Sequence, residues 1–315
     1  MMLTARRLSH APARALQAVA LYSLRDRLQL QRFSSVSRHY TELCDQLDPR
    51  GENDRYALED GYNWKRNVRE IRASFKSGVP IGFLSQPTIS ATMVFRSNPR
   101  ETRKRIDDIM FVWPEEKAAN VLREDYIGLP HIVDTRYVTS SNRVHHASHL
   151  TSYEATVGRT LDSWHTILEW GGGYGDMARL IRRLNRKCTY AIVDLPELCA
   201  LQYIYLFSLL GEEVNWMIPG RGTLIDGRIN IIPVSSVLRE EIKISAQAFI
   251  STWGLTESSK EAQTFVCERS LFGAESVLLA YSPDRHNAIR SWLLESGCVF
   301  KPIQALDNKH EYAFM

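Results

Sequence analysis

Four glycines within five residues are the strongest chemical signal in this sequence. They are Gly171, Gly172, Gly173 and Gly175 in the stretch ILEWGGGYGDMARL, residues 167–180. Glycine adopts positive φ without strain and lets the backbone come close to a ligand. A tight turn by itself needs only one or two glycines. We therefore expect this loop to hold a cofactor, with N–H groups at the start of the following helix facing its acceptor atoms.

Two cofactors fit the glycine pattern. A Gly-x-Gly-x-x-Ala run starts at Gly173, and Asp194 follows at the distance typical of dinucleotide-binding enzymes. A Glu-x-Gly-x-Gly-x-Gly run starts at Glu169, and this is the first motif of enzymes that use S-adenosylmethionine (SAM). Asp194 could accept hydrogen bonds from ribose hydroxyls in either case. The Glu169 carboxylate could bind the ammonium group of a methionine moiety, which favours SAM over NAD(P).

Further cofactor contacts follow from position. Tyr174 lies inside the glycine loop, Ser235 follows the third predicted strand, and Trp253 ends the fourth, although a tryptophan at a strand end is also common in a core. The complete predicted cofactor-binding set is Glu169, Gly171, Gly173, Tyr174, Gly175, Asp194, Leu195, Ser235 and Trp253.

If SAM is the cofactor and a hydroxyl accepts its methyl group, the oxygen must be aligned and its proton removed, for which histidine is suited near neutral pH. The segment HHASHLTSYE contains His145, His146 and His149, and the last two share one face of a predicted helix. We predict His149 or His146 as the base; the alternative is that these histidines pack the helix against the N-terminal part. Glu257 is a third candidate, or else a helix-start acid. Two histidines do not make a metal site, and we predict none.

The elements that would position these residues begin after Trp164, where short apolar runs alternate with helical patterns, as in βαβ units. The predicted strands are 166–170, 189–194, 229–234, 248–253, 276–281, 299–304 and 312–315, and the helices are 176–185, 197–210, 259–271 and 286–296. Ser258 and Glu261 have capping-box spacing at the start of the third helix. The last two strands are close in sequence, which favours an antiparallel return. We predict an α/β fold with a Rossmann-like, seven-stranded, mostly parallel sheet and a mainly helical N-terminal portion.

Three regions are expected: a basic arm (1–40), a helical cap (41–150) and a SAM-binding domain (151–315). The arm holds seven arginines and one acid, so its formal charge is +6. Because the whole chain has a net charge of +3, the remaining residues sum to −3. This distribution argues against nucleic acid as a partner. The arm is similar to a mitochondrial transit peptide; otherwise we expect a cytoplasmic protein. No apolar run has the length of a membrane span, and five scattered cysteines indicate a reducing compartment.

Four segments carry a family resemblance: SSNRVHHASHL, EWGGGYGDMARL, YAIVDLPELCALQ and FISTWGLTESSKEAQ. Together they resemble the sugar O-methyltransferase family over roughly residues 125–283. The resemblance implies a class I SAM methyltransferase fold, SAM as cofactor and a sugar-like small molecule as acceptor. The GGG and DLP elements also resemble plant-type O-methyltransferases, but Thr256 stands where those carry a catalytic histidine. An NAD(P)-dependent oxidoreductase and an inactive methyltransferase-fold binding or assembly protein are the alternatives.

Overall fold

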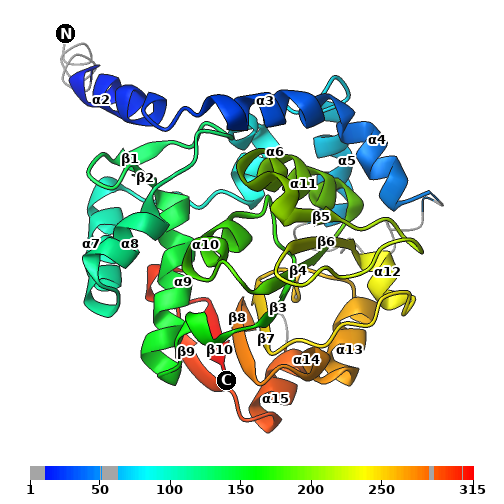
Figure 1. Cartoon of the computed structure of the whole chain (residues 1–315). Helices are drawn as coiled ribbons and strands as arrows, with labels where there is room; N and C mark the ends of the chain where they lie inside the picture. The colour runs from blue at the N-terminus through cyan, green and yellow to red at the C-terminus, as the bar shows by residue number, and fades with distance from the viewer. Residues whose placement is uncertain (1–10, 50, 52–62, 284–286, 307) are drawn as a thin grey trace.

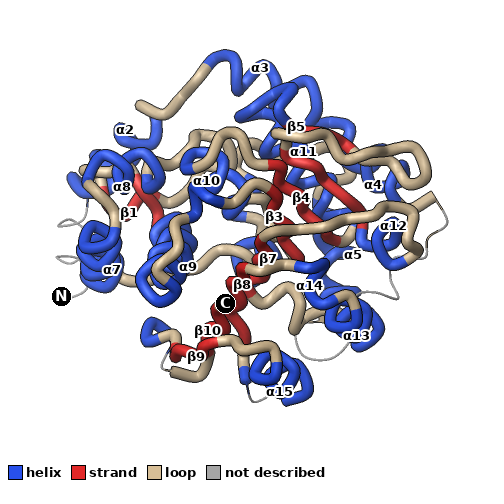
Figure 2. Tube along the Cα trace, turned by 60° about the horizontal axis from the view of Figure 1, so that its bottom comes forward, coloured by secondary structure: helices blue, strands red, loops and turns tan. Residues whose placement is uncertain are grey.

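A computed structural model describes residues 11–49, 51, 63–283, 287–306 and 308–315. Its centre is a twisted eight-stranded sheet with the order β5-β6-β4-β3-β7-β8-β10-β9 (Figure 2). The strands are β3 (Thr166–Trp170), β4 (Thr189–Asp194), β5 (Val214–Trp216), β6 (Ile229–Pro233), β7 (Ala248–Thr252), β8 (Ser276–Tyr281), β9 (Val299–Pro302) and β10 (Glu311–Phe314). All neighbouring strands are parallel except at β10, which is antiparallel to both β8 and β9.

This strand order identifies the fold. Without β5, the seven remaining strands in chain order lie as third, second, first, fourth, fifth, seventh and sixth, with the seventh antiparallel. That arrangement is the one of class I SAM methyltransferases, whereas the dinucleotide-binding fold has the order 3-2-1-4-5-6. The predicted fold class is confirmed, with one correction. The sheet has eight strands rather than seven, because the three-residue strand β5 is too short to give a recognisable pattern.

Alternate residues of each strand pack against different helices, as the two-residue repeat of a strand requires. Ile167 and Tyr190 belong to the hydrophobic cluster that includes the helices α9 (Ser141–Val157), α10 (Asp176–Leu184) and α11 (Pro196–Leu210). Leu168 and Ala191 belong to the cluster that includes α12 (Val234–Leu238), α13 (Lys260–Glu268), α14 (Ser270–Gly273) and α15 (Asn287–Glu295). Helices therefore cover both faces of the sheet (Figure 1).

The N-terminal portion is mainly helical, as predicted. Its described elements are α2 (Ala11–Tyr22), α3 (Arg27–Val36), α4 (Tyr40–Leu47), α5 (Trp64–Ser74), α6 (Pro87–Thr92), α7 (Pro99–Val112), α8 (Glu115–Leu122) and the short hairpin of β1 (Ile132–Asp134) and β2 (Thr139–Ser140). Helices α3 and α4 pack on α11, on the side away from the sheet (Figure 1). This explains why α11 is apolar almost all round, with buried side chains such as Leu201 and Tyr205.

One hydrophobic cluster joins the N-terminal helices to the sheet. Phe33 of α3, Ile71 of α5 and Ile109 of α7 belong to the same buried cluster as Ile167 of β3. The N-terminal portion is thus held against one face of the sheet. In the described part of the chain, no helix has the length and apolar character of a membrane span.

Candidate active site

A cavity of about 310 Å³ lies at the carboxyl ends of the central strands, where α/β sheets bind ligands. Three parts of the chain enclose it. The sheet provides residues that follow β3, β4, β6 and β7, and α9 provides Asn142, His145 and His146. The N-terminal portion contributes Trp64 and residues 91–95, which lie far from the sheet in sequence.

The cavity brings together nine of the twelve residues predicted for the site. They are His146, Glu169, Gly171, Gly173, Tyr174, Asp194, Leu195, Trp253 and Glu257. The other three, His149, Gly175 and Ser235, are placed outside the lining that the described residues form.

The glycines are required for packing as much as for access. Gly171, Gly173 and Gly175 have φ of +79°, +56° and +98°. A Cβ atom at Gly171 would lie 2.6 Å from the Cα of Gly254, so the loops after β3 and β7 touch backbone to backbone. At Gly173 the nearest side-chain atom is 3.8 Å away, on Met93. Gly173 is therefore the position in this loop where φ, rather than packing, requires glycine.

Asp194 organises the glycine loop. Its carboxylate accepts hydrogen bonds from the backbone N–H of Gly172 (2.9 Å) and of Leu195 (2.8 Å) and from Nε2 of Gln202 (2.7 Å). Burial raises the pKa of Asp194 to about 7, although these bonds favour the ionised form. The same carboxylate shapes the loop and lines the cavity.

Glu169 lies beneath the loop at the end of β3 and is 1% exposed. The Tyr190 hydroxyl donates a hydrogen bond to its Oε2 at 3.0 Å. Burial raises the pKa of Glu169 to about 8, and the carboxylates of Asp194 and Asp176 act in the same direction. A carboxyl in this state gains ionisation when a cation enters the cavity.

His146 faces the cavity from α9, and Asp176 holds its ring on the side away from the cavity. Its Nδ1 lies 2.8 Å from Oδ2 of Asp176, the first residue of α10. Asp176 is buried and is paired with Arg143 at 3.0 Å. A histidine held in this way by a carboxylate is the arrangement of a general base.

His149 does not reach the cavity, although it shares a helix face with His146. It is fully buried, and its Nδ1 is hydrogen-bonded to the hydroxyl of Tyr312 at 2.7 Å. Burial, together with the charges of His146 and Arg105, lowers the pKa of His149 well below its usual value. The position places this histidine against β10, in a packing role.

Gly175 and Ser235 are also displaced from the lining by packing. Gly175 precedes α10, and a Cβ atom there would lie 3.0 Å from Leu206 of α11. Ser235 is buried within α12, and its neighbour Val234 reaches the cavity instead.

An aromatic wall, formed by Phe95, His145 and Trp253, borders the cavity. The rings of Phe95 and His145 are stacked with centroids 3.9 Å apart, and His145 and Trp253 are stacked at 5.9 Å. Burial lowers the pKa of His145 well below its usual value, so its ring is neutral. Trp253 has a φ of +66°, a strained conformation for this residue type that is found most often at functional sites.

Two of the lining residues that the sequence did not predict, His310 and Trp64, bond to predicted ones. Nε1 of Trp253 donates a hydrogen bond to Nδ1 of His310 at 3.0 Å, and Nε1 of Trp64 donates to Oε2 of Glu257 at 2.8 Å. His310 precedes β10 and Trp64 begins α5, and neither lies in a motif. Only the fold brings them to this cavity, so no local signal could have identified them.

Asn142 connects the N-terminal segment to the glycine loop. Its Oδ1 accepts a hydrogen bond from the backbone N–H of Phe95 at 2.8 Å, and its Nδ2 donates to the hydroxyl of Tyr174 at 2.9 Å. Residues 91–95 are thereby held beside the loop.

The start of α13 differs from the prediction. Ser259, not Ser258, caps the helix, while Ser258 bonds to Trp170 and Gly254.

The cavity lining contains acidic side chains but no Lys or Arg among its described residues. The carboxyl groups are those of Glu169, Asp194 and Glu257. In the described part of the chain, no group of three His, Cys, Asp or Glu side chains could hold a metal ion.

No family model and no curated protein matches the sequence. Among solved structures, mitomycin 7-O-methyltransferase has 11% identity and a TM-score of 0.36, with 80% of this chain and 66% of that chain covered. An O-methyltransferase family protein from Burkholderia thailandensis has 13% identity and a TM-score of 0.35, with 68% of each chain covered.

Human N-acetylserotonin methyltransferase, solved with SAM, has 12% identity and a TM-score of 0.31, with 99% of this chain and 97% of that chain covered. Because these TM-scores are low, the assignment of the fold depends on the strand order and not on these likenesses. On that order, with β10 inserted antiparallel between β8 and β9, the chain has the α/β fold of class I SAM-dependent methyltransferases.

Proposed function

We propose that this protein is a SAM-dependent O-methyltransferase that acts on a hydroxyl of a sugar or sugar-bearing small molecule. The observation that carries the proposal is the set of acidic groups in the cavity, which can ionise when a cation binds. Three carboxyl groups and, among the described lining residues, no Lys or Arg surround the cavity. SAM carries a sulfonium and an ammonium group and is a net cation, which such a cavity favours. The pyrophosphate of NAD(P) would find no Lys or Arg side chain among the described lining residues.

The residues at the strand ends fit the parts of SAM. Asp194 would accept hydrogen bonds from the ribose hydroxyls, as an acid after the second parallel strand does in related folds. Glu169 would pair with the ammonium group, and the glycine loop leaves room for the methionine moiety. Bound SAM supplies an activated methyl group, and the protein must align the acceptor oxygen and take its proton.

His146 is the proposed general base, in preference to His149. His146 lines the cavity, and the contact of its Nδ1 with Asp176 leaves Nε2 available to accept a proton. This pair favours an enzyme over an inactive binding protein, because a histidine that lines the cavity and is held by a carboxylate is the arrangement of a general base.

The proposed acceptor class follows from Trp253 and Glu257 in the cavity lining. The ring of Trp253 offers an apolar face, and the Glu257 carboxylate, held by Trp64, offers hydrogen-bond acceptors. Sugars present C–H groups on their faces and hydroxyl donors at their edges, which suits an aromatic ring next to a carboxylate. None of the described lining residues is Lys or Arg, so the cavity does not favour an anionic acceptor.

Calorimetric titration with SAM, with its demethylated product and with NAD tests the proposal before an acceptor is known. We expect SAM and its demethylated product to bind and NAD not to bind. Product formation with radiolabelled SAM and a panel of free sugars and glycosides then tests the acceptor class. Binding of NAD without binding of SAM would overturn the assignment in favour of an oxidoreductase. Binding of SAM without turnover of any acceptor would favour the inactive alternative.

A further inference from the structure

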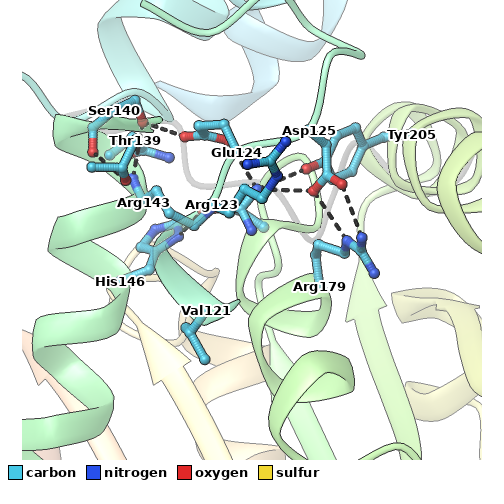
Figure 3. A network of polar contacts seen from close by, with 12 residues as sticks. Val121, Arg123, Glu124, Asp125, Thr139, Ser140, Arg143, His146, Arg179 and Tyr205 are labelled. Carbon is cyan, nitrogen blue, oxygen red and sulfur yellow. Dashed lines mark hydrogen bonds and ion pairs between the residues drawn. The ribbon is translucent and has the colours of Figure 1, made fainter. Parts of the chain in front are cut away.

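A buried network of charges lies behind His146 (Figure 3). Nδ1 of His146 contacts Oδ2 of Asp176 at 2.8 Å, and Oδ1 of Asp176 contacts Arg143 at 3.0 Å. Arg143 also contacts Glu124 at 2.9 Å and Asp125 at 3.2 Å. The side chains of Arg143 and Asp176 are 0% exposed.

The network is balanced in charge. Asp125 also pairs with Arg179 and Arg183, both at 2.9 Å. The carboxylates of Glu124, Asp125 and Asp176 therefore face the guanidinium groups of Arg143, Arg179 and Arg183, three against three. Burying so many charges is costly unless each has partners, and removal of one partner leaves an uncompensated charge.

We propose that Asp176 is a positioning residue that holds His146 in the tautomer with the proton on Nδ1, so that Nε2 is free to accept a proton from the acceptor hydroxyl. This inference rests on the proposed function, in which His146 is the base. Asp176 touches neither the cofactor nor the acceptor in this proposal and acts through His146.

The chemistry of the contact selects the tautomer. An ionised carboxylate only accepts hydrogen bonds, so Nδ1 of His146 must be the donor. Neutral imidazole carries one proton, and Nε2 is then the acceptor. Burial opposes ionisation of Asp176, but Arg143 and His146 outweigh burial and lower the pKa of this carboxyl. The start of α10 adds to this effect, because a helix N-terminus favours a negative charge.

Asp176→Asn is the decisive substitution, because Arg143 dictates its orientation. The guanidinium of Arg143 is a cation without an acceptor atom, so the new amide must turn its oxygen to Arg143 and its NH₂ group to His146. Nδ1 of His146 then has to accept, and the proton moves to Nε2. The base is blocked although the size of the side chain hardly changes.

The expected results combine turnover, binding and a spectroscopic signature. In the Asp176→Asn variant we expect kcat to fall roughly 10²- to 10⁴-fold, with little change in the KM for the acceptor or in the Kd for SAM. The ¹⁵N NMR shifts of the His146 ring should report a protonated Nδ1 in the wild type and a protonated Nε2 in the variant. His146→Gln serves as the reference for complete loss of the base.

Asp125→Asn is the matched control within the network, since it disturbs Arg143 without touching His146. It should lower the melting temperature and leave the His146 tautomer unchanged. The NMR experiment on the wild type needs neither acceptor nor a stable variant. A wild-type His146 with its proton on Nε2 would overturn the inference even if Asp176→Asn failed to fold. If the protein binds SAM but His146 carries its proton on Nε2, this inference alone is overturned. If His146 carries its proton on Nδ1 but the protein does not bind SAM, the proposed function is overturned.

Discussion

Replacing Glu169 by glutamine should stabilise the free protein and weaken its binding of SAM. In the folded protein, burial raises the pKa of this carboxyl to about 8 from an ordinary value of 4.5. The folded state therefore keeps a proton that the unfolded chain releases, and the stability of the wild type falls as pH rises from about 4.5 to about 8. Glutamine has no proton to lose, so the variant escapes this loss.

The magnitude follows from the two pKa values. Each pKa unit corresponds to about 1.4 kcal/mol, and the group is fully buried, so solvent does not screen it. Between pH 5 and pH 8 the wild type should lose at most about 3 to 4 kcal/mol of unfolding free energy relative to the Glu169→Gln variant. Tyr190 can still donate its hydrogen bond to the amide oxygen, so the packing beneath the loop is preserved.

Urea denaturation of both proteins at pH 5 and at pH 8 measures this difference. Glu268→Gln, which makes the same change at an exposed helix end, serves as the control and should change nothing. Calorimetry at pH 8 should show that Glu169→Gln weakens SAM binding by roughly 1.5 to 3 kcal/mol, the range for a hydrogen bond to a charged group. Parallel pH dependences of stability in wild type and variant would refute the reasoning, because Glu169 would then be ionised in the free protein.

The other predictions concern the loop and the base. Asp194→Ala should weaken SAM binding by roughly 1.5 to 3 kcal/mol and, in addition, lower the melting temperature, because two backbone N–H groups lose their acceptor; calorimetry and thermal denaturation separate the two effects. Gly173→Val should abolish SAM binding, whereas Gly220→Val, which has a similar φ of +69° but open space around it, should cost only stability; equal binding in both variants would mean that the loop is only a turn. His146→Gln should reduce turnover roughly 10²- to 10⁴-fold with SAM affinity retained. His149→Gln should reduce stability and leave kcat within a few-fold. If steady-state kinetics show the larger loss of kcat for His149→Gln, His149 is the base.

The sequence by itself determined most of the sheet and the position of the glycine loop. Strands 166–170, 189–194 and 276–281 are found at the predicted residues. The reason is that parallel strands buried on both faces must be short, continuous apolar runs, and the chain marks their ends with polar and glycine residues. The antiparallel return of β10 was also readable, because only a few residues separate it from β9.

Local patterns were less informative where several residues could satisfy one rule. Ser258 and Ser259 both suit a helix N-cap, and contacts of Ser258 with Trp170 and Gly254 decide between them. The three residues of β5 gave no strand pattern, and this strand forms because the edge of β6 offers it backbone partners.

Tertiary structure alone decided which side chains share the cavity. His146 and His149 lie three residues apart on α9, so helix periodicity gives both the same face. The packing of α9 between α10 and β10 turns His146 to Asp176 and the cavity and buries His149 against Tyr312. His310 and Trp64 arrive from opposite ends of the chain. The spacing of residues in a sequence shows which side chains share a face of one helix or strand. The partners of a side chain depend on how the elements pack, and contacts between residues far apart in the chain determine that packing.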